Sequence, residues 1–218
     1  MITDHEEIRK AIHRAQHCQR NWDLEQEIPK EDLDLFIESV TQCPSKQNIA
    51  HYRVHAITNR SLIEQVHHLT DGFTYNLRAG GKETQTNTQV LANLLLVFEG
   101  LPTENKLAKL RNTEVAALVD NIENARADTV MSKDAHQAVG VAAGFVNVVA
   151  SLLGYGTGCC ACFDDVRVQR LLKLENAPVL LMGIGFKQEG VNRRVHHKNP
   201  EFVFPTMPKQ NIEVVHYN

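Results

Sequence analysis

Hydrogen-bonding side chains are concentrated in one short connection. The segment 42–57 reads QCPSKQNIAHYRVHAI, and four donors follow one another in it at Ser45, Lys46, Gln47 and Asn48. A simple turn needs far less donor capacity, because a single backbone hydrogen bond often closes it. Asn both donates and accepts, while Ser and Lys add donors. The types and spacing of these side chains indicate a loop that holds a ligand.

Basic side chains form a second group of candidate binding residues. They are far apart in the sequence, and each lies beside a loop or an expected helix end: Arg14, Arg20, Lys46, Arg78, Arg193 and Arg194. Any one of them alone is best interpreted as a solvated surface charge. Together with Asn48 and Asn76 they suit an anionic, hydrogen-bonding cofactor, because guanidinium groups bind phosphate through paired hydrogen bonds.

Three other patterns are weaker candidates for chemistry. Gly80-Gly81-Lys82-Glu83 resembles a phosphate-binding loop, but Glu follows the Lys where Ser or Thr is needed. His13 and His17 are one helical turn apart, yet no further ligand stands at a recognisable spacing, so no metal is expected. The cysteines of CCAC at 159–162 lack a second pair of ligands, and packed thiols are the preferred interpretation.

The bulk composition limits the class of protein. The 218 residues are 43% hydrophobic and 22% charged with a formal net charge of −3, which favours neither a nucleic-acid nor a membrane partner. No apolar run follows a basic N-terminus, and the longest apolar run, 138–153, is short for a membrane span. Five cysteines, an odd number, indicate reduced thiols. We therefore expect one cytoplasmic domain, residues 1–218.

Apolar periodicity predicts the elements that position these side chains. We expect helices at 4–17, 31–43 and 61–69, and strands at 52–57, 159–163, 178–186 and 202–204. The apolar run 90–98 has the length of a strand, with a buried helix as the alternative. The glycine-containing segment 71–86 is expected to be a mobile loop. Such irregular alternation is typical of an α+β fold.

One helix is apolar on nearly every side. Residues 135–153 read AHQAVGVAAGFVNVVASLL, which predicts a central helix buried all round and ended by Gly154. Its small residues allow close helix packing, so we expect it to pack against its copy in a dimer. The preceding residues 104–133 are polar and helix-prone, and they are expected to form an exposed excursion or a lid.

Four motifs occur in order along most of the chain. They are HCQRNW at 17–22, PSKQNIAHY at 44–52, a stretch from Leu153-Gly154 through CCAC to Phe163-Asp164, and an apolar strand at 179–185 followed by Asn192-Arg193-Arg194. In type and order they resemble the nitroreductase family of FMN-dependent oxidoreductases. The chain departs from the family pattern at Cys18, which replaces a serine, at Ala50 and His51, which replace Gln-Pro, and at Gln16 and His17, where arginines are common.

The resemblance implies a fold, a partner and an activity. It implies an α+β nitroreductase-like fold, with a mostly antiparallel central sheet flanked by helices, in an intertwined homodimer. The implied activity is hydride transfer from NADH or NADPH to FMN, and then to a nitroaromatic, quinone or similar small-molecule acceptor, in a ping-pong cycle. A flavin-fragmenting or reductive-dehalogenating relative, and an FMN-binding protein without turnover, remain the alternatives. Residues 100–135 would be a lid or excursion that shapes substrate access.

The resemblance also implies roles for single residues. Arg20 would place a cation near the pyrimidine edge of the flavin, where it favours the reduced cofactor. Lys46 and its neighbours would reach the flavin bound by the partner subunit, with Asn76 a second candidate for the same edge. The phosphate would meet Arg14, His17, Arg193 or Arg194, because a thiol at Cys18 is a poor donor.

No catalytic side chain is expected, because the flavin carries the redox chemistry. The complete set of expected cofactor-binding residues is Gln16, His17, Cys18, Arg20, Pro44, Ser45, Lys46, Asn48, Asn76, Cys159, Cys160, Ala161, Cys162, Arg193 and Arg194.

Overall fold

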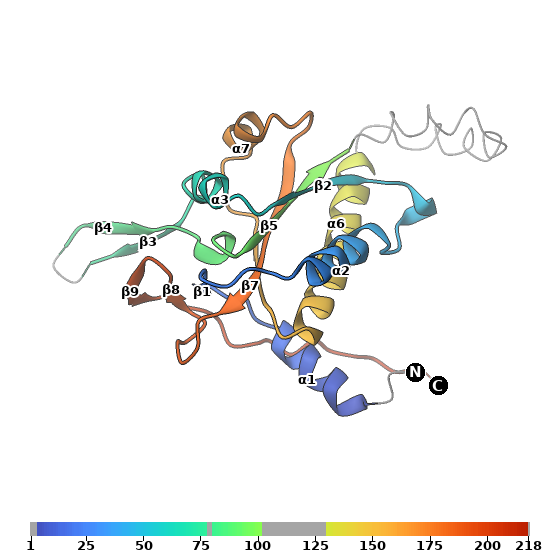
Figure 1. The fold of residues 1–218 in the computed structure, drawn as a ribbon, viewed down its shortest axis with the longest axis horizontal. Coiled ribbons are helices and arrows are strands. Elements are labelled where there is room, and N and C mark those ends of the chain that lie inside the picture. The colour runs from blue at the N-terminus through green and yellow to red at the C-terminus, as the bar shows by residue number, and fades with distance from the viewer. Residues whose placement is uncertain (1–3, 78–79, 102–129, 218) are drawn as a thin grey trace.

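A five-stranded antiparallel sheet forms the centre of the chain (Figure 1). The structure, a computed structural model, describes residues 4–77, 80–101 and 130–217. The strands of the sheet are β1 (Trp22–Asp23), β2 (Tyr52–Ile57), β5 (Leu94–Gly100), β6 (Gly156–Cys160) and β7 (Pro178–Lys187). β7 is the central strand: β5 and β6 pair with opposite sides of it, and β2 lies beyond β5. β1 pairs with the end of β7, at Phe186 and Lys187. The predicted α+β class with a mostly antiparallel sheet is confirmed.

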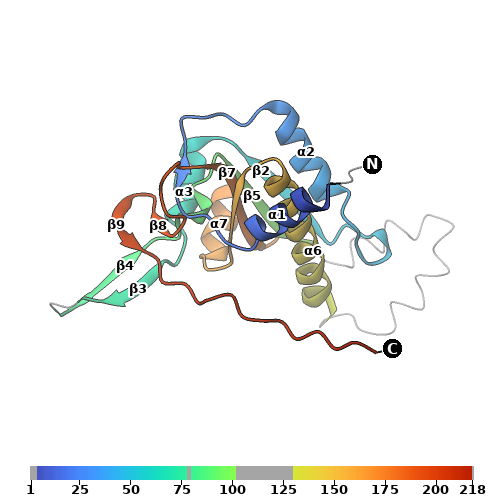
Figure 2. The same cartoon turned by 90° about the horizontal axis from the view of Figure 1, so that it is seen from below.

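Helices cover both faces of this sheet and make two separate cores. β5 shows why: Leu95 and Val97 face the core beneath α3 (Arg60–His67) and α7 (Asp165–Leu172), whereas Leu96 and Phe98 face the core beneath α2 (Lys30–Thr41) and α6 (Val130–Leu152). A strand buried on both faces needs an unbroken apolar sequence, as LLLVF is. α1 (His5–Ala15) lies outside α6 and alongside it (Figure 2).

The long apolar helix is present, but a single chain buries only one side of it. Val139, Ala142, Val146 and Ala150 pack against the core, whereas four large apolar side chains remain 38–47% exposed: Val141, Phe145, Val148 and Leu152. One chain alone therefore does not bury this helix all round, and its expected burial against a copy in a dimer stays a prediction. Lys133–Leu152 is apolar and long enough to cross a membrane by length and composition alone, a property that core helices share. Gly154 ends the helix with a φ of 89°, as expected.

Two hairpins project from the body near each other (Figure 1). The predicted loop at 71–86 is wrong, since β3 (Phe73–Asn76) and β4 (Lys82–Gln85) pair there. The second hairpin joins β8 (Val195–His196) and β9 (Asn199–Val203). The Tyr75 and Phe202 rings stack across the two hairpins at 4.9 Å, a contact between distant segments that local sequence does not reveal.

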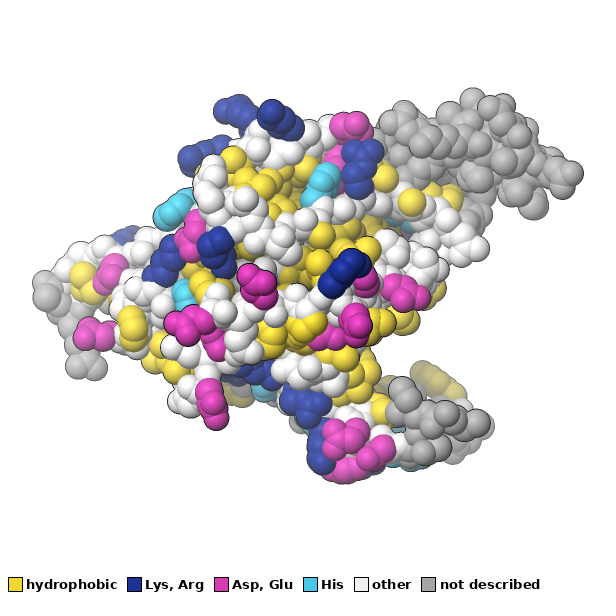
Figure 3. All heavy atoms as spheres, in the orientation of Figure 1, with side chains coloured by type: hydrophobic (Ala, Val, Ile, Leu, Met, Phe, Trp, Pro, Cys, Tyr) yellow, Lys and Arg dark blue, Asp and Glu magenta, His cyan; other side chains and the backbone are white. Residues whose placement is uncertain are grey.

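Other boundaries differ from the expectations in smaller ways. The apolar run 90–98 enters β5 only at Leu94, because Thr88–Val90 form the 3₁₀ turn η2. A second such turn, η1 (Lys46–Asn48), follows α2, and α7 was not predicted. Most of the expected lid, residues 102–129, lies outside the described residues. Basic and acidic side chains are interspersed over the face seen in Figure 3.

Candidate functional site

The segment after α1 is held rigidly between three parts of the fold. The Gln19 N–H donates to the Thr157 carbonyl of β6 at 2.7 Å, and the Arg20 N–H donates to the Arg193 carbonyl at 3.0 Å. The Thr88 hydroxyl of η2 donates to the Arg20 carbonyl at 2.7 Å. Because β6, η2 and the segment at 193 all bond to its backbone, the position of Arg20 is fixed by the fold rather than by a mobile loop.

The Arg20 guanidinium lies in a half-buried site with few partners of its own. Its Nη1 donates to the Gln89 Oε1 at 2.6 Å, and its Cζ lies 4.0 Å from the centroid of the buried Phe204 ring. Its Nε is buried and has no hydrogen-bond partner among the described residues. Burial lowers the pKa of Arg20, while the nearby Cys18 and Cys160 thiols raise it. Arginine remains charged in proteins, so the site keeps a fixed cation with an unused buried donor.

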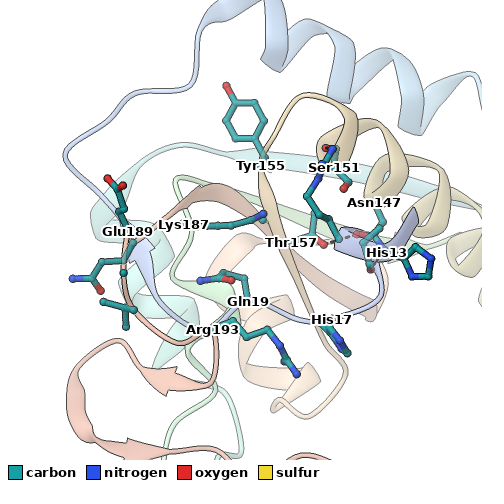
Figure 4. A pocket seen from close by; sticks show the side chains of 16 residues that line it. His13, His17, Gln19, Asn147, Ser151, Tyr155, Thr157, Lys187, Glu189 and Arg193 are labelled. Carbon is teal, nitrogen blue, oxygen red and sulfur yellow. Dashed lines mark hydrogen bonds between the residues drawn. The ribbon is translucent and has the colours of Figure 1, made fainter. Parts of the chain in front are cut away.

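A basic cavity of about 390 Å³ opens next to this segment (Figure 4). Five residues that carry or can gain a positive charge line it, against one carboxylate, Glu189: His13, Arg14, His17, Lys187 and Arg193. The Arg193 Nη1 donates to the Cys18 carbonyl at 3.3 Å. Burial and the charge of Arg193 lower the pKa of His17, and burial and Arg14 lower that of Lys187. The contribution of a neighbouring arginine to each of these two lowered pKa values shows that the cavity has a positive potential, which suits an anionic ligand.

The cysteines of β6 are unreactive by their environment. Burial raises the pKa of the Cys159 thiol to about 12 and that of Cys160 to about 11. Both are therefore neutral near pH 7, and neutral thiols are poor nucleophiles. Ala161 and Cys162 follow the strand and are exposed. The strand supplies backbone groups and shape rather than a reactive sulfur.

The loop after α2 is set apart from Arg20. The segment that contains η1 lies on the opposite side of α6 from β1 in both ribbon views (Figures 1 and 2). The Lys46 Nζ pairs with the Asp134 carboxylate at 2.7 Å. Asn48 is exposed with a φ of 55°, and with Ser45 it lines a separate cavity of about 370 Å³.

One chain thus brings together only part of the predicted set. Cys18, Arg20, Cys159, Cys160 and Arg193 gather around β6, with Gln16 and His17 beside them at the end of α1. The loop residues Pro44, Ser45, Lys46 and Asn48 are elsewhere, and Asn76 lies in the β3–β4 hairpin. Arg194 is not among the residues that line the basic cavity. The roles of all these residues stay predictions.

Sequence reasoning missed several residues that build the site. Gln89 is buried in η2 and bonds to Arg20, Thr157 bonds to the segment beside it, and Lys187 lines the cavity. Gln89 ends a polar run, Thr86-Asn87-Thr88-Gln89, that leads into a buried strand. That run was the available signal, because polar side chains next to buried strands are often functional.

A group of potential metal ligands occurs elsewhere on α3. Among the described residues, the ligand atoms of Glu64, His67 and His68 lie within 4.8 Å of one another. The Glu64 carboxylate is already engaged there by the Lys198 ammonium and, at 3.7 Å, by Arg60. Glu64 therefore already belongs to an ion-pair network that ties α3 to the β8–β9 hairpin.

Comparisons with known proteins agree with the motifs. Residues 14–186 match the model of the nitroreductase family. A comparison with curated proteins gave no significant match.

Solved structures share the fold. A provisionally assigned nitroreductase, YdfN from Bacillus subtilis, is 19% identical with a TM-score of 0.69, over 92% of this chain and 99% of that one. A provisionally assigned nitroreductase from Exiguobacterium sibiricum, solved in complex with FMN, is 17% identical with a TM-score of 0.67, over 93% of both chains. A provisionally assigned NAD(P)H:FMN oxidoreductase from Staphylococcus epidermidis is 18% identical with a TM-score of 0.65, over 84% and 87%.

Proposed function

We propose that this chain, which belongs to the nitroreductase family, is a flavin-dependent oxidoreductase that binds FMN. The proposed reductant is NADH or NADPH, and the proposed acceptor is a nitroaromatic, a quinone or a similar small molecule. One observation carries this proposal: a fixed cation with an unused buried donor, Arg20, stands beside a basic cavity. FMN combines a polar ring edge rich in acceptors with an anionic phosphate. The unused donor of Arg20 suits the ring edge, and the basic cavity suits the phosphate.

The cation at Arg20 fits the ring end of the cofactor. FMN, when bound, would supply the hydride chemistry itself. Arg20 would hold a positive charge where negative charge gathers on the reduced ring, in a site already shaped by Gln89 and Phe204. Cys159 and Cys160, whose thiols stay neutral, would contribute the wall of the site and no covalent step.

The basic cavity fits the phosphate end. Arg193 and Arg14 can each offer a fork of donors, and Lys187 adds a point charge. His17 lies at the same cavity, and Figure 4 shows its ring and the end of Arg193 side by side. Of the four candidates for the phosphate, Arg14, His17 and Arg193 are favoured over Arg194, which is not in the lining.

We also propose a cytoplasmic homodimer in which α6 packs against its copy. Three observations support the pairing. The outer face of α6 exposes large apolar side chains, the loop at 44–48 lies away from Arg20, and the tail after Phe204 is extended and exposed (Figure 2). That tail carries Met207, Ile212 and Tyr217, each at least 80% exposed. The cytoplasm suits the five free cysteines.

Turnover with a model acceptor tests the function. FMN-loaded protein should consume NADH or NADPH continuously when menadione is added, and the flavin-free protein should not. A protein that binds FMN tightly but consumes no nicotinamide with any of several quinones and nitroaromatics would instead be a flavin-binding protein without turnover.

A further inference from the structure

The side chain of Gln89 connects the cation to the sheet. Its Oε1 accepts from the Arg20 Nη1 at 2.6 Å, and its Nε2 donates to the Cys159 carbonyl at 3.2 Å. One amide therefore spans the space between the guanidinium and β6. Only a side chain that both accepts and donates can make this bridge, and an amide does so without a charge.

The surrounding backbone leaves Gln89 little freedom. A Cβ at Gly158 would lie 2.5 Å from the Cβ of Gln89. A Cβ at Gly183 would lie 2.1 Å from the backbone carbonyl oxygen of Gln89. Glycines in β6 and β7 thus let η2 approach the sheet closely. The Trp22 indole N–H also donates to the Thr88 carbonyl at 2.8 Å, which fixes the start of η2. The amide is consequently held in place before it meets Arg20.

We propose that Gln89 is a positioning residue that fixes the place of the Arg20 guanidinium without compensating its charge, and that it thereby sets the redox potential of bound FMN. This inference rests on the proposed FMN site. The neutral amide matters, since a carboxylate at the same position would pair with the guanidinium and cancel its charge. Methionine, whose thioether is only a weak acceptor, would release Nη1, and the guanidinium would then keep mainly its contact with Phe204.

Three variants of the full-length protein separate these effects. In FMN-loaded Gln89→Glu, the ratio of reduced to oxidised cofactor at a fixed applied potential should fall at least about tenfold, which is about 30 mV for a two-electron couple. Gln89→Met should give a smaller fall of the same sign. Gln169→Glu, which introduces the same charge on α7, should leave the potential unchanged.

Two further measurements show whether Gln89 acts through Arg20. Adding Gln89→Met to Arg20→Met should change the potential no further, because coupled residues are not additive. A crystal structure of flavin-free Gln89→Met should show the guanidinium displaced, and this readout needs no cofactor. An unmoved Arg20 there, or equal potentials in Gln89→Glu and the unmodified protein, would overturn the proposal. Failure to bind FMN would instead count against the proposed function.

Discussion

Replacing Gly144 with leucine should change the stability of the protein in opposite directions, depending on whether α6 is free or packed against its copy. In the single chain Gly144 is exposed, and a Cβ there would meet no atom within 4 Å. Leucine is a better helix former than glycine, so a free helix would gain about 0.5–1 kcal/mol of stability. If α6 instead packs closely against its copy, the added side chain overpacks the contact and costs about 1–3 kcal/mol or prevents assembly. The sign of the change therefore distinguishes the two states.

The exposed face of α6 sets the energy available for pairing. Val141, Phe145, Val148 and Leu152 are 38–47% exposed. Complete burial of such a side chain is worth about 1.5–3 kcal/mol, so covering the exposed part is worth about 1 kcal/mol each. Both copies together supply about 8 kcal/mol, within the range of about 4–15 kcal/mol that association costs. The helices alone would give marginal pairing, and the apolar tail has to add to it.

Sedimentation and urea unfolding at two protein concentrations measure the outcome. Gly144→Leu should lower the dimer fraction and the free energy of unfolding, with a larger loss in the concentrated sample. Gln65→Leu is the control, because it adds an exposed leucine to α3, outside the proposed contact. A Gly144→Leu protein that remains dimeric and becomes more stable would refute the pairing of α6.

Three other predictions concern the cation, the cavity and a buried histidine. Arg20→Ala should slow reduction of bound FMN by NADPH about 30- to 1,000-fold in stopped flow, and Arg20→Lys should recover much of the rate, because a point charge suffices. Riboflavin should bind far more weakly than FMN in a fluorescence titration, and Arg193→Ala should narrow the difference, because riboflavin lacks the phosphate. Burial lowers the pKa of His67 to about 3. In the unfolded chain this histidine binds a proton below about pH 6.5, whereas in the folded chain it stays neutral down to about pH 3. Acidification from pH 6.5 toward pH 3 should therefore lower the free energy of unfolding by up to about 1.4 kcal/mol per pH unit. In urea unfolding, His67→Leu should make this pH dependence of stability shallower by up to that amount, while Glu64, His196 and His197, whose pKa values are also lowered, retain their own contributions.

Each of these predictions has its own contrary result. An unchanged reduction rate and potential in a fully loaded Arg20→Ala protein would refute the role of the charge. Equal affinities for the two flavins would refute a phosphate in the basic cavity. The exposed neighbour His68 is the control for His67, and a slope lost equally in His68→Gln would show that burial is not the cause.

Short sequence patterns correctly predicted those elements whose own residues determine their structure. Tyr52–Ile57 forms a strand with the predicted bounds, and the apolar helix ends at Gly154 as expected. The hairpin at 73–85 was missed, because it is supported by stacking of Tyr75 on Phe202, 127 residues further along the chain. No window of sequence contains both rings.

The cations of the site could be predicted from the sequence, but the residues that hold them in place could not. Arg20 and Arg193 lie beside β6, the strand that the motifs indicated. Both are basic residues next to loops, which was the signal in the sequence. Gln89 was missed, because its role depends on how closely η2 approaches β6. Gly158 and Gly183, two glycines inside strands, are the sequence features that mark this approach.

The absorbance spectrum of the purified protein tests the assignment most directly. The protein should be yellow, with about one FMN per chain that acid releases intact, because Arg20 and the basic cavity are held ready for the two ends of this cofactor. A colourless protein that takes up no FMN on reconstitution, although it is folded, would contradict the assignment.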